Sequence, residues 1–464
     1  MDAATRKVFD ERFKELHPAL EPEEAAVEAH RCLYCYDAPC VTACPTHIDV
    51  PRFIKQISSD NLLGSAKTIL EANALGHSCA RACPVEVLCE GACVYHEWQE
   101  RPISIAALQR RATDALNESG RQPFKPGPDN GRQVAVVGAG PAGVACATYL
   151  RRLGYGVTIY DRDKTPGGLN TFGIAEYKMT AKVSLDEIER ALKLGIKLEL
   201  GVEIGKDLSV DKLRSEYDAL FVGIGLGDTN NLRVPGEDLK GVWDALSFIR
   251  CVKERDLKPL GKSACTIVIG AGNTSIDAVT QSKRAGAARV IMAYRRGEEE
   301  MGAYGFEYAL AKSDGAEFLW NAAPVRVLGK TKVEGVEFQR TKTVAGKLQP
   351  APKSNFTVAC DRVIKAIGQT KQLTLAKTLG LALEKDGRIQ VDPDTLQTSA
   401  AGVFAGGDAI NGGKEVVNAA ADGKRAAWGI HRRLQPGKPP PPGNDYWIST
   451  IDGRKVAPIP ERHG

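Results

Sequence analysis

The chain has 464 residues, which is too long for one compact core, so we expect two to four domains. Hydrophobic residues make up 43% and charged residues 26%, values that exclude a largely disordered chain. The formal net charge of +5 comes without a dense basic block, which argues against nucleic acid or a membrane surface as partner.

The first thirty residues are polar and acidic and lack the apolar run of a secretory signal peptide. No stretch approaches the about 18 uninterrupted apolar residues of a membrane span. We therefore expect a cytoplasmic protein. In that reducing compartment, cysteines are more often metal ligands or buried thiols than disulfides.

The cysteines are concentrated near the N-terminus, where eight of the twelve lie between residues 32 and 93. The first run reads C-x2-C-x4-C-x3-C-P and the second C-x3-C-P-x4-C-x3-C. Disulfides, zinc and iron–sulfur clusters all remain possible uses. Clustered cysteines that end in Cys-Pro favour iron–sulfur clusters over zinc, whose ribbons use two well separated CxxC pairs.

Around these runs, apolar residues recur at helical spacing in segments 47–77 and 103–118. The sequence predicts an all-helical module over residues 1–125 with its cysteines on loops. A segment rich in proline and glycine, RQPFKPGPDNGR, follows as a linker.

From Gln133 the pattern changes to strand, glycine turn, helix and strand. The glycine loop binds a pyrophosphate at the start of its helix, and the acid at the end of the second strand accepts hydrogen bonds from a ribose. A second loop, Gly167-Gly168-Leu169, adds a close approach to the ligand. The residues expected to bind this dinucleotide are Gly138, Gly140, Pro141, Ala142, Gly143, Asp161, Gly168 and Leu169.

A later segment, GVFAGGDAINGG, is similar to the second flavin motif of flavoproteins with two dinucleotide sites. In that motif Asp408 would hold the ribityl chain, with Gly407 before it also expected to bind the cofactor, so we expect FAD at the first site. The next helix would direct its positive N-terminal end at the flavin ring. The FAD domain is therefore expected to be discontinuous, 131–240 plus 386–435.

A second glycine loop opens a helix at Gly270 and Gly272, with Asn273 and Thr274 in the first turn. After the next strand stand Arg295 and Arg296, where NAD-specific sites carry an acid. Arginine accommodates a 2′-phosphate, so the sequence predicts an NADP(H)-binding domain over 241–385. NAD(H) is the alternative, if the two arginines are only solvated surface charges.

A flavin beside a nicotinamide site indicates hydride transfer to the flavin. The four remaining cysteines are too dispersed to form the redox pair of a disulfide reductase. Electrons must then leave another way, and a cluster that accepts one electron at a time suits this purpose. We expect no acid–base catalytic residue.

The proline-rich tail, residues 436–464, has no helical or strand period. It is either a linker-like end or, because Tyr446, Trp447 and Ile448 are apolar anchors, an arm that holds a partner.

Several motifs together resemble the glutamate-synthase small-subunit-like flavoproteins over residues 25–435. Within that family the similarity is greatest to the electron-input part of dihydropyrimidine dehydrogenase, a separate subunit in bacteria. The motifs are RCLYCYDAPCVTACP, HSCARACPVEVLCEGAC followed by ISIAALQ, GAGPAG, PGGLNTFGIAEYKM, YRR and TLQTSAAGVFAGGD.

The resemblance implies a helical iron–sulfur module followed by two Rossmann-like dinucleotide-binding domains. It also implies two [4Fe–4S] clusters with interleaved ligands. One would be held by Cys32, Cys35, Cys40 and Cys93, and the other by Cys44, Cys83, Cys89 and the amide oxygen of Gln109. Cys79 would be a bystander, although a count of thiolates alone would make Cys79 the ligand instead of Gln109.

The resemblance further implies an electron-input subunit that passes electrons from NAD(P)H through FAD and two clusters to an FMN/iron–sulfur catalytic subunit, in a heterotetramer. In this family uracil or thymine is reduced on an FMN-bearing barrel of about 250 residues. The chain has no room for such a barrel, so the partner would carry out this reduction. The alternatives are the small subunit of NADPH-dependent glutamate synthase, a related ferredoxin-linked NAD(P)H oxidoreductase, or a non-catalytic iron–sulfur scaffold that senses nucleotide.

Overall fold

The computed structural model describes residues 3–344, 346–438, 450–451 and 454–455. Its residues form two compact units, each made of separate chain segments. Unit 1 comprises Met1–Leu16, Phe172–Ala181 and Gly227–Thr370. Unit 2 comprises His17–Thr171, Lys182–Leu226 and Lys371–Gly464.

The N-terminal part of unit 2 is helical. Its core forms because apolar residues recur along one face of each helix, such as Val50, Phe53, Ile54 and Ile57, all buried. The elements are α2 (Pro22–His30), α3 (Pro39–Thr42), α4 (Val50–Ser58), α5 (Leu62–Ala72), α6 (Gly76–Ala82), η1 (Val85–Val87), η2 (Val94–Trp98) and α7 (Ile105–Glu118). This agrees with the predicted helical module. The prediction that all its cysteines lie on loops is wrong for Cys40, which is in α3, and for Cys79, which is in α6.

The rest of unit 2 is built on a five-stranded parallel sheet of order β13-β4-β1-β2-β3. Strands β1 and β4 read VAVV and ALFV and are buried, as in a parallel sheet covered on both faces. The strands are β1 (Gln133–Val137), β2 (Gly156–Asp161), β3 (Lys197–Leu200), β4 (Ala219–Val222) and β13 (Val403–Ala405).

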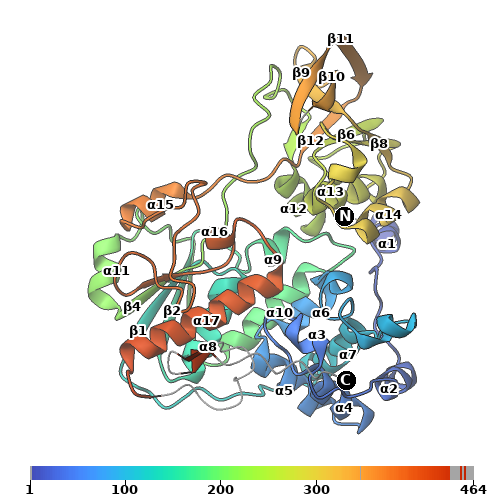
Figure 1. Cartoon of the computed structure of the whole chain (residues 1–464). Helices are drawn as coiled ribbons and strands as arrows, with labels where there is room; N and C mark the ends of the chain where they lie inside the picture. The colour runs from blue at the N-terminus through green and yellow to red at the C-terminus, as the bar shows by residue number, and fades with distance from the viewer. Residues whose placement is uncertain (1–2, 345, 439–449, 452–453, 456–464) are drawn as a thin grey trace. The chain divides into compact units, whose positions relative to one another are not determined.

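Helices α8 and α17 pack against each other in this part of unit 2, α8 directly after β1 and α17 near the C-terminus (Figure 1). The helices are α8 (Pro141–Arg152), α9 (Leu169–Phe172), α10 (Ala181–Leu192), α11 (Val210–Glu216), α15 (Leu373–Thr378), α16 (Asp408–Asn411) and α17 (Val416–Leu434). A short antiparallel pair, β14 (Thr450–Ile451) and β15 (Arg454–Lys455), lies further along the chain.

Unit 1 contains a second five-stranded parallel sheet, of order β5-β12-β6-β7-β8, and a three-stranded antiparallel sheet, of order β11-β10-β9. The strands are β5 (Val242–Asp244), β6 (Cys265–Ile269), β7 (Arg289–Ala293), β8 (Glu317–Leu319), β9 (Ala322–Leu328), β10 (Gly335–Val344), β11 (Lys347–Ala359) and β12 (Arg362–Lys365). The helices are α1 (Ala3–Arg12), α12 (Ala245–Lys253), α13 (Asn273–Arg284), η3 (Glu298–Glu300) and α14 (Gly305–Ser313).

A helical module followed by two parallel α/β sheets confirms the predicted fold class. The two compact units divide the chain elsewhere than the predicted domains do: α1 belongs to unit 1, for example. The predicted domain boundaries therefore stay a prediction. The tail anchors Tyr446, Trp447 and Ile448 lie outside the described residues. Among the helices that the structure describes, none combines the length and apolar character needed to cross a membrane.

Candidate cofactor sites

Four cysteines from both runs line one cavity in the helical module: Cys32, Cys35, Cys40 and Cys93. Cys32 and Cys35 lie on the loop after α2, Cys40 lies on α3, and Cys93 immediately precedes η2. The structure thus brings one cysteine of the second run to three of the four in the first run, the grouping that the resemblance implies. Burial, with the nearby cysteine thiols, raises the pKa of Cys40 to about 12.

The wall of this cavity is apolar. It includes Val50 and Ile54 of α4 and Ile103 and Ile105 at the start of α7. Across the described part of the chain, no three His, Cys, Asp or Glu side chains converge on a single metal ion. A [4Fe–4S] cluster takes four cysteine thiolates, one on each iron, so four thiols around a cavity fit such a group.

A second group of cysteines lies on and after α6. A hydrogen bond with Cys79, one helical turn earlier, and burial raise the pKa of Cys83. The charges of Cys44 and Cys89 also raise the pKa of Cys83, and that of Cys44 raises the pKa of Cys89. The grouping of these three cysteines around one cluster stays a prediction.

Gln109 belongs to the same region. It lies on α7, is buried, and donates a hydrogen bond from Nε2 to the Gly76 carbonyl at the start of α6 (2.6 Å). Cys79 is thus part of α6, and Gln109 is held against that helix. The choice between them as fourth ligand stays a prediction.

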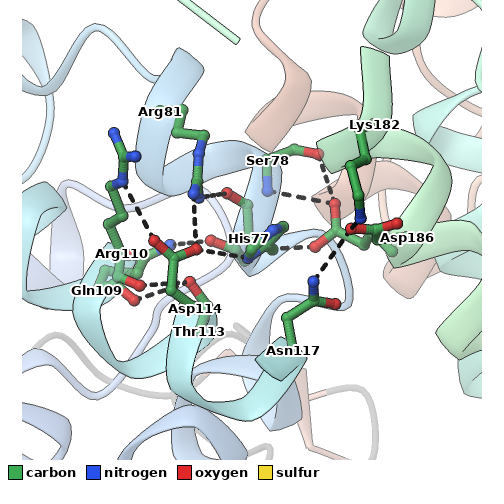
Figure 2. Close-up of polar contacts among 12 residues, drawn as sticks. His77, Ser78, Arg81, Gln109, Arg110, Thr113, Asp114, Asn117, Lys182 and Asp186 are labelled. Atoms are coloured by element: carbon green, nitrogen blue, oxygen red, sulfur yellow. Dashed lines mark hydrogen bonds and ion pairs between the residues drawn. The ribbon is translucent and has the colours of Figure 1, made fainter. Parts of the chain in front are cut away.

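A buried polar network fixes α6 (Figure 2). Glu187 of α10 is 1% exposed. Its carboxylate accepts hydrogen bonds from the His77 backbone N–H (2.8 Å) and from Ser78 Oγ (2.5 Å). Asn170 also donates to Ser78 Oγ (2.9 Å). The helix with Cys79 and Cys83 at its end is therefore tied to α10 and to the segment after Gly168.

On its other side, α6 is joined to α7 by charged groups. Arg81 donates to Asp114 (2.6 Å), which also forms an ion pair with Arg110 at 3.3 Å (Figure 2). Burial lowers the pKa of His77 to about 2, so its imidazole is neutral. Sequence reasoning missed this network, because its members are polar residues in helices with no shared motif.

The first glycine loop has the geometry of a pyrophosphate-binding turn. Gly138 has φ +107°, and a Cβ there would lie 2.3 Å from the Gly223 carbonyl oxygen. A Cβ on Gly143 would lie 1.9 Å from the Gly138 carbonyl oxygen, so helix and strand meet closely.

The space beside Gly140 is open. A Cβ at Gly140 would meet none of the described atoms within 4 Å, although Gly168 approaches its Cα. Gly140 caps α8, whose first residues are Pro141 and Ala142. The N-terminal N–H groups of α8 thus border a free volume where a phosphate could be bound.

Asp161, at the end of β2, holds the loop in place. Its carboxylate accepts hydrogen bonds from the backbone N–H of Ala139 (2.6 Å) and of Asp163 (2.8 Å). Burial raises its pKa. Leu169, 38% exposed, begins α9 beside Gly168.

The C-terminal motif lies next to this loop. Gly407 has φ +69°, and a Cβ there would lie 3.1 Å from the Ala142 Cβ. Asp408 begins α16, and its carboxylate accepts a hydrogen bond from the Lys414 N–H (3.1 Å). Two segments more than 260 residues apart thus meet at the start of α8, as the predicted discontinuous flavin site requires.

The second glycine loop repeats this geometry in unit 1. Gly270 has φ +136°, and a Cβ there would lie 2.2 Å from the Ala366 carbonyl oxygen. Gly272 caps α13 and also faces open space, with nothing in the described residues within 4 Å of a Cβ. In the first turn of α13, Asn273 accepts a hydrogen bond from the Tyr304 N–H (3.0 Å), and Thr274 is exposed.

Arg295 and Arg296 follow β7 directly, and β7 pairs with β6, the strand that leads into this loop. Arg295 is exposed and Arg296 half-buried. Arg296 Nε lies 3.7 Å from the Glu300 carboxylate. Arg295 and Arg296 thus lie at the strand end where a dinucleotide-binding fold ordinarily recognises the ribose, and Arg296 is paired with Glu300 there.

Two family models match the chain. Residues 9–121 match dihydropyrimidine dehydrogenase domain II, 4Fe-4S cluster, and residues 132–423 match pyridine nucleotide-disulphide oxidoreductase.

Curated relatives cover most of the chain. It is 35% identical to the glutamate synthase [NADPH] small chain of Halomonas elongata, over 90% of this chain and 93% of that one. It is 33% identical to the corresponding chain of Escherichia coli K12, over 92% and 95%. It is also 35% identical to the NAD-dependent dihydropyrimidine dehydrogenase subunit PreT of Escherichia coli O157:H7, over 91% and 97%.

Solved structures share the fold. FprA of Mycobacterium tuberculosis in complex with NADPH superposes with a TM-score of 0.55 at 18% identity, covering 65% of this chain and 84% of that one. The thioredoxin reductase of T. acidophilum gives 0.52 at 22% identity, covering 65% and 99%.

These matches confirm the resemblance inferred from the motifs, and with it the cofactor types FAD, 4Fe–4S clusters and NAD(P)H. The chain belongs to the pyridine nucleotide-disulphide oxidoreductase family, as a homologue of glutamate synthase small chains and an FAD- and iron–sulfur-containing NAD(P)H oxidoreductase.

Proposed function

We propose that this chain is the electron-input subunit of a dihydropyrimidine dehydrogenase. The match of residues 9–121 to the iron–sulfur domain of that enzyme supports this most directly. The relative named as a dihydropyrimidine dehydrogenase subunit, 35% identical, supports it as well.

Each cofactor has a proposed set of ligands in this chain. The pyrophosphate of FAD would be bound at Gly138, Gly140 and Gly143 and the first turn of α8, with Gly168, Leu169, Gly407 and Asp408 around it. Asp161, whose carboxylate also accepts two backbone hydrogen bonds in the loop, would accept hydrogen bonds from the ribose. FAD bound there would accept electrons as a hydride and release them singly.

The nicotinamide dinucleotide would be bound at Gly270, Gly272, Asn273 and Thr274. The clusters would be held by Cys32, Cys35, Cys40 and Cys93, and by Cys44, Cys83, Cys89 and Gln109. The apolar wall around the first set lowers the dielectric constant there. In the second set Cys44 is buried, and the remaining cysteines of both sets are half-buried. We propose no acid–base residue, because the chain contributes placement and electrostatics.

The partner would be an FMN/iron–sulfur catalytic subunit, in a heterotetramer that reduces uracil or thymine to the 5,6-dihydro form. The relatives are named as a small chain and as a subunit, which supports a hetero-oligomer.

We propose NADPH as the preferred donor, because Arg295 and Arg296 stand where a 2′-phosphate is recognised. The names of the relatives include both an NADPH-dependent and an NAD-dependent enzyme.

A second candidate is the small subunit of a glutamate synthase. The two small chains, 35% and 33% identical over 90% or more of this chain, favour it. Both functions need the same cofactors, so the partner decides between them.

The deciding experiment is anaerobic purification with the proteins that co-purify, followed by assays of iron, sulfide, FAD and FMN. We expect about eight irons and one FAD per chain. NADPH should bleach the isolated chain without uracil turnover, and the complex should reduce uracil. Turnover of glutamine with 2-oxoglutarate, and none of uracil, would favour the glutamate synthase. Zinc in place of iron would refute both.

A further inference from the structure

Helix α17 carries a buried lysine. Lys424 is 1% exposed, and its ammonium donates hydrogen bonds to the carbonyl oxygens of Thr46 (2.9 Å) and Ala72 (2.7 Å). A buried charge is costly unless polar groups replace its water. The two carbonyl oxygens take the place of part of that water.

The orientation of Lys424 follows from its neighbour. A Cβ on Gly423 would lie 2.2 Å from the Ala142 carbonyl oxygen, so α17 and α8 touch through their backbones. This contact fixes the rotation of α17 about its axis. Lys424 then reaches the helical module past Tyr149 of α8, whose ring centre is 5.8 Å from Nζ.

The two carbonyl groups come from the end of α5 and from the segment after Cys44. Ala72 is the last residue of α5, where helix carbonyls lack intrahelical partners and carry partial negative charge. Thr46 lies two residues after Cys44, and its Oγ1 is 3.3 Å from Cys44 Sγ. Thr46 thus contacts the Lys424 ammonium through its carbonyl and Cys44, a proposed cluster ligand, through its hydroxyl.

The charges around Lys424 act in opposite directions. Burial lowers its pKa to about 7, a Cys44 thiolate opposes this, and Arg152 adds to it. A cluster bound by thiolates adds further negative charge close to Lys424, which favours the ammonium form.

We propose that Lys424 tunes the reduction potential of the cluster that Cys44 holds, by placing a fixed positive charge beside it. Reduction adds one negative charge to the cluster, and a nearby cation in a medium of low dielectric constant stabilises that state. Lys424 would therefore raise the potential of this cluster. The inference rests on the proposed assignment of Cys44 as a ligand.

A structural role would explain the same contacts, because Lys424 also caps the C-terminus of α5. The two roles are separated by measuring midpoint potentials. Lys424→Gln keeps a hydrogen-bond donor and removes the charge, Lys424→Met keeps the length and removes both, and Lys424→Arg keeps the charge.

The experiment is an anaerobic redox titration of the full chain with its cofactors, followed by electron paramagnetic resonance. The iron and sulfide of the unsubstituted protein are measured first, because their absence would refute the proposed function rather than the role of Lys424. In Lys424→Gln and Lys424→Met, we expect one cluster to become about tenfold harder to reduce, a shift of 59 mV for one electron. The other cluster should keep its midpoint potential. In Lys424→Arg, which keeps the charge, the equilibrium constant for reduction of the affected cluster should stay within about threefold of its value in the unsubstituted protein.

Unchanged potentials in both neutral variants would overturn the proposal. So would neutral variants that bind FAD but lose iron, because Lys424 would then be needed to assemble the module. Equal shifts in the midpoint potentials of both clusters would also contradict the proposal, because the charge of Lys424 should act mainly on the cluster nearest to it.

Discussion

At the scale of single residues, we expect Arg295 to set the preference between NADPH and NADH. Arg295 is exposed directly after β7, in the position where a 2′-phosphate would be recognised. A hydrogen bond to a charged group contributes about 1.5–3 kcal/mol. We expect Arg295→Ala to raise KM for NADPH about 10- to 100-fold and to leave KM for NADH unchanged, in assays with an artificial electron acceptor.

The control is Arg289→Ala, at the start of the same strand. Arg289 is already paired with Glu317 at 2.6 Å, so its loss should not alter either KM. Equal effects of Arg295→Ala on NADPH and NADH would show that Arg295 does not recognise the phosphate.

The glycines of the first loop should differ in what they do. Gly143→Ala forces a Cβ against the Gly138 carbonyl, and overpacking of this kind costs about 1–3 kcal/mol. Gly140→Ala meets open space, so the protein should keep its thermal stability without FAD and lose FAD affinity. Calorimetry of the apoprotein and FAD titration test both. Normal FAD binding by Gly140→Ala would show that the pyrophosphate of FAD is not bound beside Gly140.

At the scale of elements, α6 depends on α10 through Glu187. Glu187→Ala leaves the His77 N–H and Ser78 without their acceptor and Arg190 without its ion pair. Breaking a buried ion pair costs about 3–5 kcal/mol. We expect denaturant unfolding to show that loss, together with a lower iron content, because α6 positions Cys83.

Glu189 on the same helix supplies the control. It is exposed and pairs with Lys193 at 3.3 Å, so Glu189→Ala should change stability by less than about 1 kcal/mol. Full iron content in Glu187→Ala would mean that the hydrogen bonds of Glu187 to α6 are not needed to position Cys83 for iron binding.

Helix α17 should confer a pH dependence on stability. His431 is buried and hydrogen-bonded to the Tyr155 hydroxyl (2.9 Å), and burial lowers its pKa below 6.5. The unfolded chain then takes up the proton first, so stability falls as the pH drops below about 6.5. The slope is at most about 1.4 kcal/mol per pH unit.

His431→Gln should flatten this slope between pH 6.5 and 5.5, measured by urea unfolding at each pH. His17→Gln, at an exposed position, should leave it unchanged. An identical slope in both variants would assign the acid sensitivity to other groups.

At the scale of the whole molecule, the features that could be predicted from the sequence are those formed by residues close together in the chain. The glycine loops are predictable because each strand, turn and helix lies within about thirty residues. Helical spacing was enough to predict the cysteine module. The grouping of Cys93 with the first run came only from the family resemblance, since spacing does not pair distant loops.

Long-range polar contacts could not be predicted. Glu187 and Ser78 are 109 residues apart, and Lys424 and Thr46 are 378 apart. A lysine in a helix ordinarily indicates a surface position, and only the backbone contact at Gly423 directs this one inward. Such contacts depend on tertiary packing rather than on local sequence.

The division into two units predicts independent unfolding. Lys178, in the unit 1 segment Phe172–Ala181, forms buried ion pairs with Asp277 (2.8 Å) and Glu307 (2.6 Å). Lys178→Met leaves two buried carboxylates without this partner, at a cost of about 3–5 kcal/mol. In calorimetry we expect the transition that NADPH stabilises to move to lower temperature, and the one that FAD stabilises to stay. Lys193→Met, which removes an exposed ion pair in unit 2, should move neither. A single transition that shifts as a whole would mean that the two units unfold together.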